Sequence, residues 1–105
     1  MTASPAPVSS VLETIGRTPV VRLQHVVAPG SAHVVMKLEY FNPTGSYKDR
    51  MALAMIEGGE RSGRLRPGMR VVEYTGGSTG SSLALVCAMK GYRFHPLSSD
   101  AFATE

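Results

Sequence analysis

The sequence predicts an α/β fold in which strands alternate with helices around a mostly parallel sheet. Short runs rich in β-branched residues have the length and composition of strands. Two apolar segments have the length of helices and stand between the later strands. Turns that contain glycine or proline separate consecutive segments. The predicted strands are 18–23, 33–39, 70–74 and 93–97, and the predicted helices between them are 49–60 and 81–90.

Length and composition indicate one small domain. The chain has 105 residues, of which 43% are hydrophobic, enough to fill a single core. Residues 1–8 are small, polar and proline-rich and predict a loose tail, so the folded part is expected to span 9–105. Within it, Ser10 and Glu13 predict a capping box for a short helix that ends at Gly16.

Residues 42–50 are predicted to form the turn between a strand and the first long helix. Proline and glycine within the turn end the strand. Ser46 is predicted to cap the helix, and Asp49, three residues later, to complete a capping box. Gly58 and Gly59 are predicted to end the helix.

Lys48 is the residue of chemical interest in this turn. It falls in the first turn of the predicted helix, where the helix dipole disfavours a cation. Because only the neutral amine is a nucleophile, this position favours amine chemistry. The alternative is a solvated surface lysine, which is the usual role of an isolated lysine.

A second glycine-rich turn, 75–80, is predicted between a strand and a helix. Its glycines allow close approach of the backbone, and the free N–H groups of the helix start point toward a ligand. Thr75, Ser78 and Thr79 add hydroxyl groups, so the turn predicts an anion site. It is not a common phosphate loop, because no lysine follows the last glycine and the spacing differs from Gly-x-Gly-x-x-Gly.

Charge and residue spacing argue against several other functions. The net charge of +3 is modest, and the arginines between positions 61 and 70 lack the interleaved aromatic residues that nucleic-acid binding would need. The three histidines are not at metal-ligand spacing. No apolar run approaches the roughly 20 residues that span a bilayer, and residues 1–8 show no signal-peptide pattern. The single cysteine, Cys87, excludes an internal disulfide and favours a cytoplasmic location, so we expect a cytoplasmic protein without nucleic-acid, metal or membrane partners.

Two segments resemble the same enzyme family. Residues 42–50, NPTGSYKDR, resemble the lysine signature of the fold-type II pyridoxal-phosphate enzymes, the tryptophan synthase β-like group that includes cysteine synthase and cystathionine β-synthase. Residues 15–23, IGRTPVVRL, resemble the opening of the cysteine synthases. The resemblance implies the N-terminal part of a tryptophan synthase β-like fold. It also implies pyridoxal 5′-phosphate as the cofactor, held by Lys48 as a Schiff base.

The turn 75–80, TGGSTG, is similar to the substrate-carboxylate loop of this family, usually written Thr-Ser-Gly-Asn-Thr-Gly. Ser78 stands where the family has an asparagine that contacts the 3′ oxygen of the cofactor. Gly76 stands where a serine is usual, so the sequence departs from the centre of the cysteine synthase subgroup at two positions. The residues implied are Lys48 and Ser78 for the cofactor, and Thr75, Gly76, Gly77 and Thr79 for the substrate.

The resemblance implies β-replacement or β-elimination on a small amino-acid substrate, as in making cysteine from O-acetylserine and sulfide. Lys48 would hold the cofactor and then act as the base that removes the α proton. The full-length enzyme is expected to be a homodimer. Because the family's phosphate-binding loop lies downstream of the stretch resembled here, the chain is expected to be an incomplete N-terminal portion without activity of its own. Two alternatives stay open: a threonine dehydratase or threonine synthase relative, and a non-catalytic protein that keeps the fold.

Overall fold

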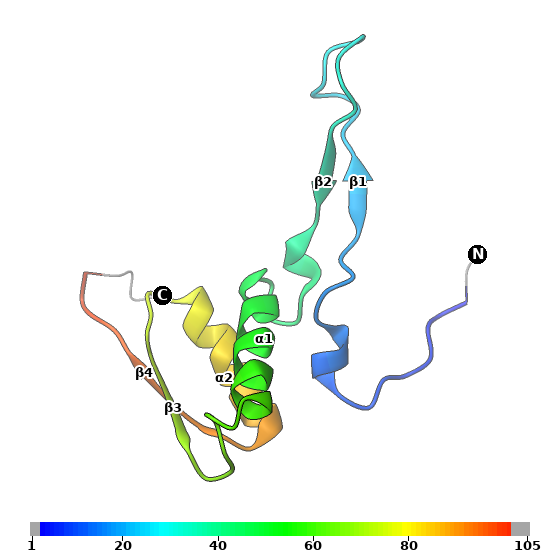
Figure 1. Ribbon diagram of the computed structural model, residues 1–105. Coiled ribbons are helices and arrows are strands. Elements are labelled where there is room, and N and C mark those ends of the chain that lie inside the picture. The colour runs from blue at the N-terminus through cyan, green and yellow to red at the C-terminus, as the bar shows by residue number, and fades with distance from the viewer. Residues whose placement is uncertain (1–2, 102–105) are drawn as a thin grey trace.

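The computed structural model describes residues 3–101 and contains two helices, four strands and two short 3₁₀ helices in the described part (Figure 1). Residues 3–8 form neither helix nor strand. Residues 1–2 of the predicted tail and 102–105 of the predicted domain lie outside the described residues. The elements are, in order, η1 (Val11–Thr14), β1 (Val20–Arg22), β2 (Val35–Lys37), η2 (Glu39–Phe41), α1 (Lys48–Arg61), β3 (Arg70–Tyr74), α2 (Ser78–Lys90) and β4 (Arg93–Leu97).

The four strands form two separate pairs. β3 and β4 are parallel, with Arg70 opposite Arg93, and α2 is the crossover between them. β1 and β2 are antiparallel, with Val20 opposite Lys37, and this hairpin projects away from the two helices (Figure 1). The parallel arrangement predicted for the sheet therefore describes the later pair. The earlier pair differs because no helix separates its strands, and a parallel pair needs a long crossover connection.

The core lies between α1 and α2. Ala52 and Ile56 of α1 meet Leu83, Val86 and Cys87 of α2, and all five are buried. The buried α1 residues are spaced four apart, which places them on one face of the helix. Cys87 packs in this core as a small apolar side chain, and its burial raises the pKa of the thiol.

The predicted helix 49–60 ends one residue before the observed end of α1 at Arg61. The prediction that Gly58 and Gly59 end this helix is wrong, because both residues lie within it. A side chain at Gly59 would place its Cβ 3.1 Å from the Cβ of Leu65. The glycine therefore lets the chain after the helix fold back onto it. The helix ends before Gly63, whose φ of 73° suits a residue without a side chain.

The predicted start of the second helix is also late by three residues. α2 begins at Ser78, because the side chain of Thr75 satisfies N–H groups at the helix start. Its end agrees with the prediction, since Gly91 adopts the left-handed conformation (φ 82°) after Lys90. In the described part of the chain, neither helix is long and apolar enough to cross a membrane.

A polar cluster joins the ends of α1 and α2. Lys90 Nζ lies 2.8 Å from Glu60 Oε1, and the Tyr92 hydroxyl donates to Glu60 Oε2 at 3.1 Å. The hydrogen bond from Lys90 is the main reason that the pKa of Glu60 lies below its ordinary value of 4.5. The cluster therefore links the two helices at the end opposite their N-termini.

We predict that Lys90→Met reduces the loss of stability in acid. A carboxyl whose pKa is lowered by folding stabilises the protein above its unfolded pKa, and this contribution is lost as the pH falls through the folded pKa. Without Lys90, folding lowers the pKa of Glu60 by less, so this residue contributes less to the pH dependence of stability. Thermal unfolding followed by circular dichroism from about pH 6 to about pH 3 measures the effect.

The matched control is Arg64→Met, which removes a cation from the exposed segment after α1. This control should keep the acid dependence of the parent chain. The same dependence in Lys90→Met as in the parent chain would show that the cluster does not link stability to pH.

Candidate functional site

Lys48 is the first residue of α1, one position earlier than the predicted helix start. Its backbone N–H donates to Ser46 Oγ at 3.1 Å, so Ser46 does support the helix start. Its amine lies 5.1 Å from the centre of the Tyr47 ring, a cation–π distance. Among the described residues, no ion pair involves Lys48, and its side chain is half-buried. The amine is therefore accessible and is not held by a carboxylate.

The predicted capping box between Ser46 and Asp49 does not form. The Asp49 side chain is fully buried and turns toward α2 instead of back toward Ser46. Its Oδ1 accepts the Ser82 hydroxyl at 2.6 Å and the Thr44 hydroxyl at 2.5 Å, and its Oδ2 accepts the Thr44 N–H at 2.8 Å. A donor from the neighbouring helix thus replaces the local partner that the spacing predicted.

A second hydrogen-bond network holds both ends of the segment 42–50. Asn42 is buried, accepts the Gly16 N–H at 2.8 Å and donates to Glu39. Arg50 Nε donates to Glu39 Oε1 at 3.0 Å, and this bond is the largest cause of the lowered pKa of Glu39. Thr18 also bonds to both Glu39 and Arg50. The network therefore fastens the segment before β1 to the start of α1.

Thr75 is buried at the start of the glycine-rich turn, directly after β3. Its Oγ1 accepts the N–H of Gly77 at 3.1 Å and the N–H of Gly80 at 3.0 Å. A hydroxyl oxygen has two acceptor positions and one proton, so these bonds leave the proton available to a further acceptor. The side chain of Thr75 thus caps α2 and can still donate to an anion.

The other predicted residues of this turn lie beside Thr75. Gly76 and Gly77 are exposed, and Gly77 adopts φ 156° and ψ −88°, a conformation that favours glycine. Ser78 is exposed and Thr79 is half-buried, and both are in the first turn of α2. The N–H groups of a first helical turn have no acceptor within the helix, so this end favours an anion.

Both candidate segments lie at the same end of the pair of helices α1 and α2. α1 and α2 lie side by side with their N-termini at one end (Figure 1), and the Asp49–Ser82 hydrogen bond joins the first turn of α1 to the second turn of α2. β3 leads into the turn 75–80 at this end, where ligands usually bind in α/β folds. Within residues 3–101, no hydrogen bond joins the Lys48 amine to the turn, so the site consists of two adjacent parts.

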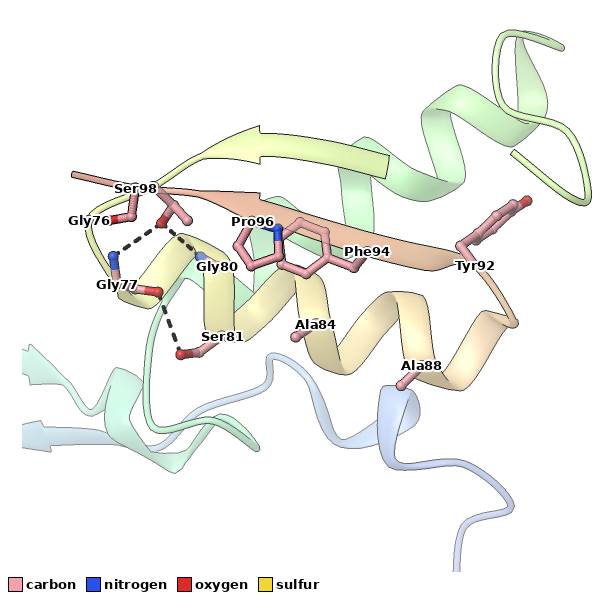
Figure 2. A pocket seen from close by; sticks show the side chains of 11 residues that line it. Gly76, Gly77, Gly80, Ser81, Ala84, Ala88, Tyr92, Phe94, Pro96 and Ser98 are labelled. Atoms are coloured by element: carbon pink, nitrogen blue, oxygen red, sulfur yellow. Dashed lines mark hydrogen bonds between the residues drawn. The ribbon is translucent and has the colours of Figure 1, made fainter. Parts of the chain in front are cut away.

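A groove of about 660 Å³ extends from the turn along the other side of α2 (Figure 2). Its walls are mostly apolar and come from α2 and β4, whereas Lys48 does not line it. The sequence did not predict this groove, because its residues are brought together only by the packing of α2 on β4. The lining residues are Thr75, Gly76, Gly77, Gly80, Ser81, Ala84, Ala88, Tyr92, Phe94, Pro96 and Ser98.

We predict that Gly80→Ala destabilises the turn and with it the protein. A Cβ at this position would stand 2.7 Å from Thr75 Cγ2, so the capping side chain would have to move. Overpacking of this kind costs roughly 1–3 kcal/mol of unfolding free energy, measurable by urea denaturation. The neighbouring control Ser81→Ala should change stability by less than about 0.5 kcal/mol. Equal stability of Gly80→Ala and the parent chain would exclude the close Thr75 contact.

Comparison with known proteins identifies the family. A family model described as "Pyridoxal-phosphate dependent enzyme" matches residues 11–101. Cysteine synthase of Staphylococcus aureus (strain Mu50 / ATCC 700699) is 56% identical over 87 residues, which are 83% of this chain and 28% of that protein. O-ureido-L-serine synthase of Streptomyces lavendulae is 48% identical over 97 residues, 92% of this chain and 30% of that protein.

Solved structures agree in fold. The crystal structure of O-ureido-L-serine synthase superposes with a TM-score of 0.86 at 46% identity, covering 94% of this chain and 31% of that one. Cysteine synthase from Entamoeba histolytica gives a TM-score of 0.82 at 39% identity, covering 91% of this chain and 30% of that one. The chain spans about three-tenths of the length of these relatives. With the fold of a tryptophan synthase β-like enzyme over this length, the chain belongs to the family of pyridoxal-phosphate dependent enzymes.

Proposed function

We propose that this chain supplies the cofactor lysine and the substrate-carboxylate turn of an enzyme that acts on amino acids with a leaving group on Cβ. The proposal rests on one observation: the starts of α1 and α2 are joined at the same end of the helix pair. One start bears Lys48 and the other bears the turn 75–80, and the Asp49–Ser82 hydrogen bond connects them. For the whole protein we propose cysteine synthase-like β-replacement, with O-acetylserine and sulfide as the substrates.

The surroundings of Lys48 fit pyridoxal phosphate. Its amine has no carboxylate partner among the described residues, and an aromatic ring lies beside it. A covalent bond to the cofactor aldehyde needs such an accessible amine. Ser78, exposed at the start of α2, would donate to the 3′ oxygen of the cofactor. When bound, the cofactor supplies an electron sink for the negative charge that develops at the substrate Cα.

The turn 75–80 would hold the substrate carboxylate. The acceptor positions of Thr75 Oγ1 are occupied by backbone N–H groups, so its hydroxyl can act toward a ligand only as a donor. A donor is what a carboxylate requires. Thr79 and the N–H groups at the start of α2 would complete the set, and Gly76 and Gly77 leave the backbone open to the ligand.

Lys48 would also move the proton of the reaction. The Lys48 amine, when it is not bound to the cofactor, would accept the proton from the substrate Cα. Its place beside the carboxylate turn supports this role, because a general base must lie within hydrogen-bond reach of the proton that it removes. We propose a homodimer for the full-length protein and a cytoplasmic location, for which the lone buried Cys87 is the supporting observation.

One observation favours a second candidate within the same reaction class. The relative from Streptomyces lavendulae, 48% identical, is named for making O-ureido-L-serine and not cysteine. Gly76 and Ser78 also differ from the usual cysteine synthase turn, and both replacements are small. We therefore propose two candidates for the nucleophile that adds at Cβ: sulfide and a larger group.

We predict that pyridoxal phosphate becomes attached to Lys48 in preference to the other two lysines, Lys37 and Lys90. Lys90 is paired with Glu60, which raises its pKa, and Lys37 Nζ donates to the Thr18 carbonyl at 3.3 Å. Borohydride reduction followed by peptide mass spectrometry locates the attached cofactor. Lys48→Ala should abolish the main adduct, whereas Lys37→Ala should leave it unchanged. Equal labelling of all three lysines would contradict the proposal.

We predict that O-acetylserine, and not threonine, changes the visible absorption of the whole protein loaded with pyridoxal phosphate. A good leaving group on Cβ is what separates a cysteine synthase-like site from a threonine dehydratase-like site. Serine is the matched control, because it differs from O-acetylserine only in the leaving group. A response to threonine alone would favour the dehydratase alternative, and no response to any of the three would favour a non-catalytic protein.

A further inference from the structure

Asp49 carries a carboxylate that is fully buried, although the residues on either side of it, Lys48 and Arg50, are only partly covered. Its three hydrogen-bond donors are neutral, and no ion pair in the described part of the chain involves it. As the second residue of α1, it also lies where the helix dipole favours a negative charge. The fold therefore buries this carboxyl group without an ion pair among the described residues.

The donors of Asp49 come from both sides of Lys48. Thr44 precedes the lysine by four residues and donates its N–H and its hydroxyl, so the segment 44–49 is closed into a loop. Ser82 donates from α2, which joins this loop to the helix that follows the turn 75–80. Lys48 lies within the closed loop, and its own N–H is held by Ser46. The backbone of the lysine is thus fixed relative to α2.

Asp49 itself does not face the site. Successive helical residues point about 100° apart, so Asp49 faces α2 while Lys48 lies on the flank beside Tyr47. The Glu39–Arg50 network does not provide the same connection, because its partners all come from the segment before α1. Of these two networks, the Asp49 carboxylate is the one that reaches α2.

We propose that Asp49 is a positioning residue for Lys48: by binding Thr44 and Ser82, it holds the lysine at a fixed place beside the turn 75–80. This inference rests on the proposed role of Lys48 as the cofactor lysine. In this role Asp49 affects the reactivity of Lys48 indirectly, through the backbone and through α2. It would act through Thr44 and Ser82, without touching cofactor or substrate.

The first test compares Asp49→Asn with Glu57→Gln, the same chemical change at a half-buried position on the same helix. Loss of a hydrogen bond to a charged group should accelerate amide exchange at Thr44 by at least about tenfold in the chain without cofactor. Exchange at Gly16, whose N–H binds Asn42 in the other network, is the internal reference and should change less than exchange at Thr44. The amount of pyridoxal phosphate that borohydride reduction attaches to Lys48 (trapping at Lys48) should fall by about tenfold relative to the amount attached to Lys37 in the same chain. Glu57→Gln should alter neither quantity.

A second pair of variants decides the question if Asp49→Asn does not fold. Thr44→Val keeps the shape of the side chain and removes its hydroxyl donor, whereas Thr44→Ser keeps the donor. Thr44 is exposed, so neither change disturbs the core. Thr44→Val should lower trapping at Lys48, whereas Thr44→Ser should keep it at the level of the parent chain.

The outcomes separate this inference from the proposed function. Faster exchange at Thr44 with unchanged trapping at Lys48 would overturn the positioning role and leave Asp49 a purely structural residue. Unchanged exchange at Thr44 would overturn the connection itself. Equal trapping at Lys37, Lys48 and Lys90 in the parent chain would instead overturn the proposed function, and exchange at Thr44 would still decide whether Asp49 holds the loop.

Discussion

The buried carboxylate of Asp49 connects the two helix starts from which the candidate site is built. Its donors come from Thr44, in the turn before α1, and from Ser82, in the first turns of α2. A hydrogen bond to a charged group is worth about 1.5–3 kcal/mol, and a buried group that loses its partners costs a comparable amount. The relative placement of Lys48 and the turn 75–80 therefore depends on this side chain as well as on the packing of α1 against α2.

The parts of the fold that the sequence predicted are those with local signals. β3 and β4 have the predicted bounds, and each follows a glycine with positive φ, Gly68 at 88° and Gly91 at 82°. The parallel pairing follows from the helix between them. Lys48 and the turn 75–80 were found in the same way, because each belongs to a short motif at the start of a helix. Only the structure shows that the two motifs lie close together.

The departures arise where a side chain takes a partner that is distant in sequence. Asp49 has the spacing of a capping box with Ser46, but its carboxylate accepts a hydrogen bond from Ser82, 33 positions further along the chain. Ser82 could be suspected from its place on a mostly apolar helix, yet sequence alone does not show what it faces. Thr75 likewise caps α2 across a turn, so the helix begins at Ser78, before the predicted position. The spacing of residues in the sequence does not show whether a side chain will bond to a neighbour in the sequence or to a residue that is distant in the sequence.

A double-mutant cycle between Asp49→Ala and Ser82→Ala tests the connection between the two helix starts most directly. The free energy of unfolding is measured by urea denaturation for the parent chain, both single variants and the double variant. If the Asp49–Ser82 hydrogen bond joins α1 to α2 as described, the two substitutions should couple by about 1 kcal/mol or more. Additive effects, within about 0.3–0.5 kcal/mol, would contradict the account, because the helix starts would then be held together by other contacts.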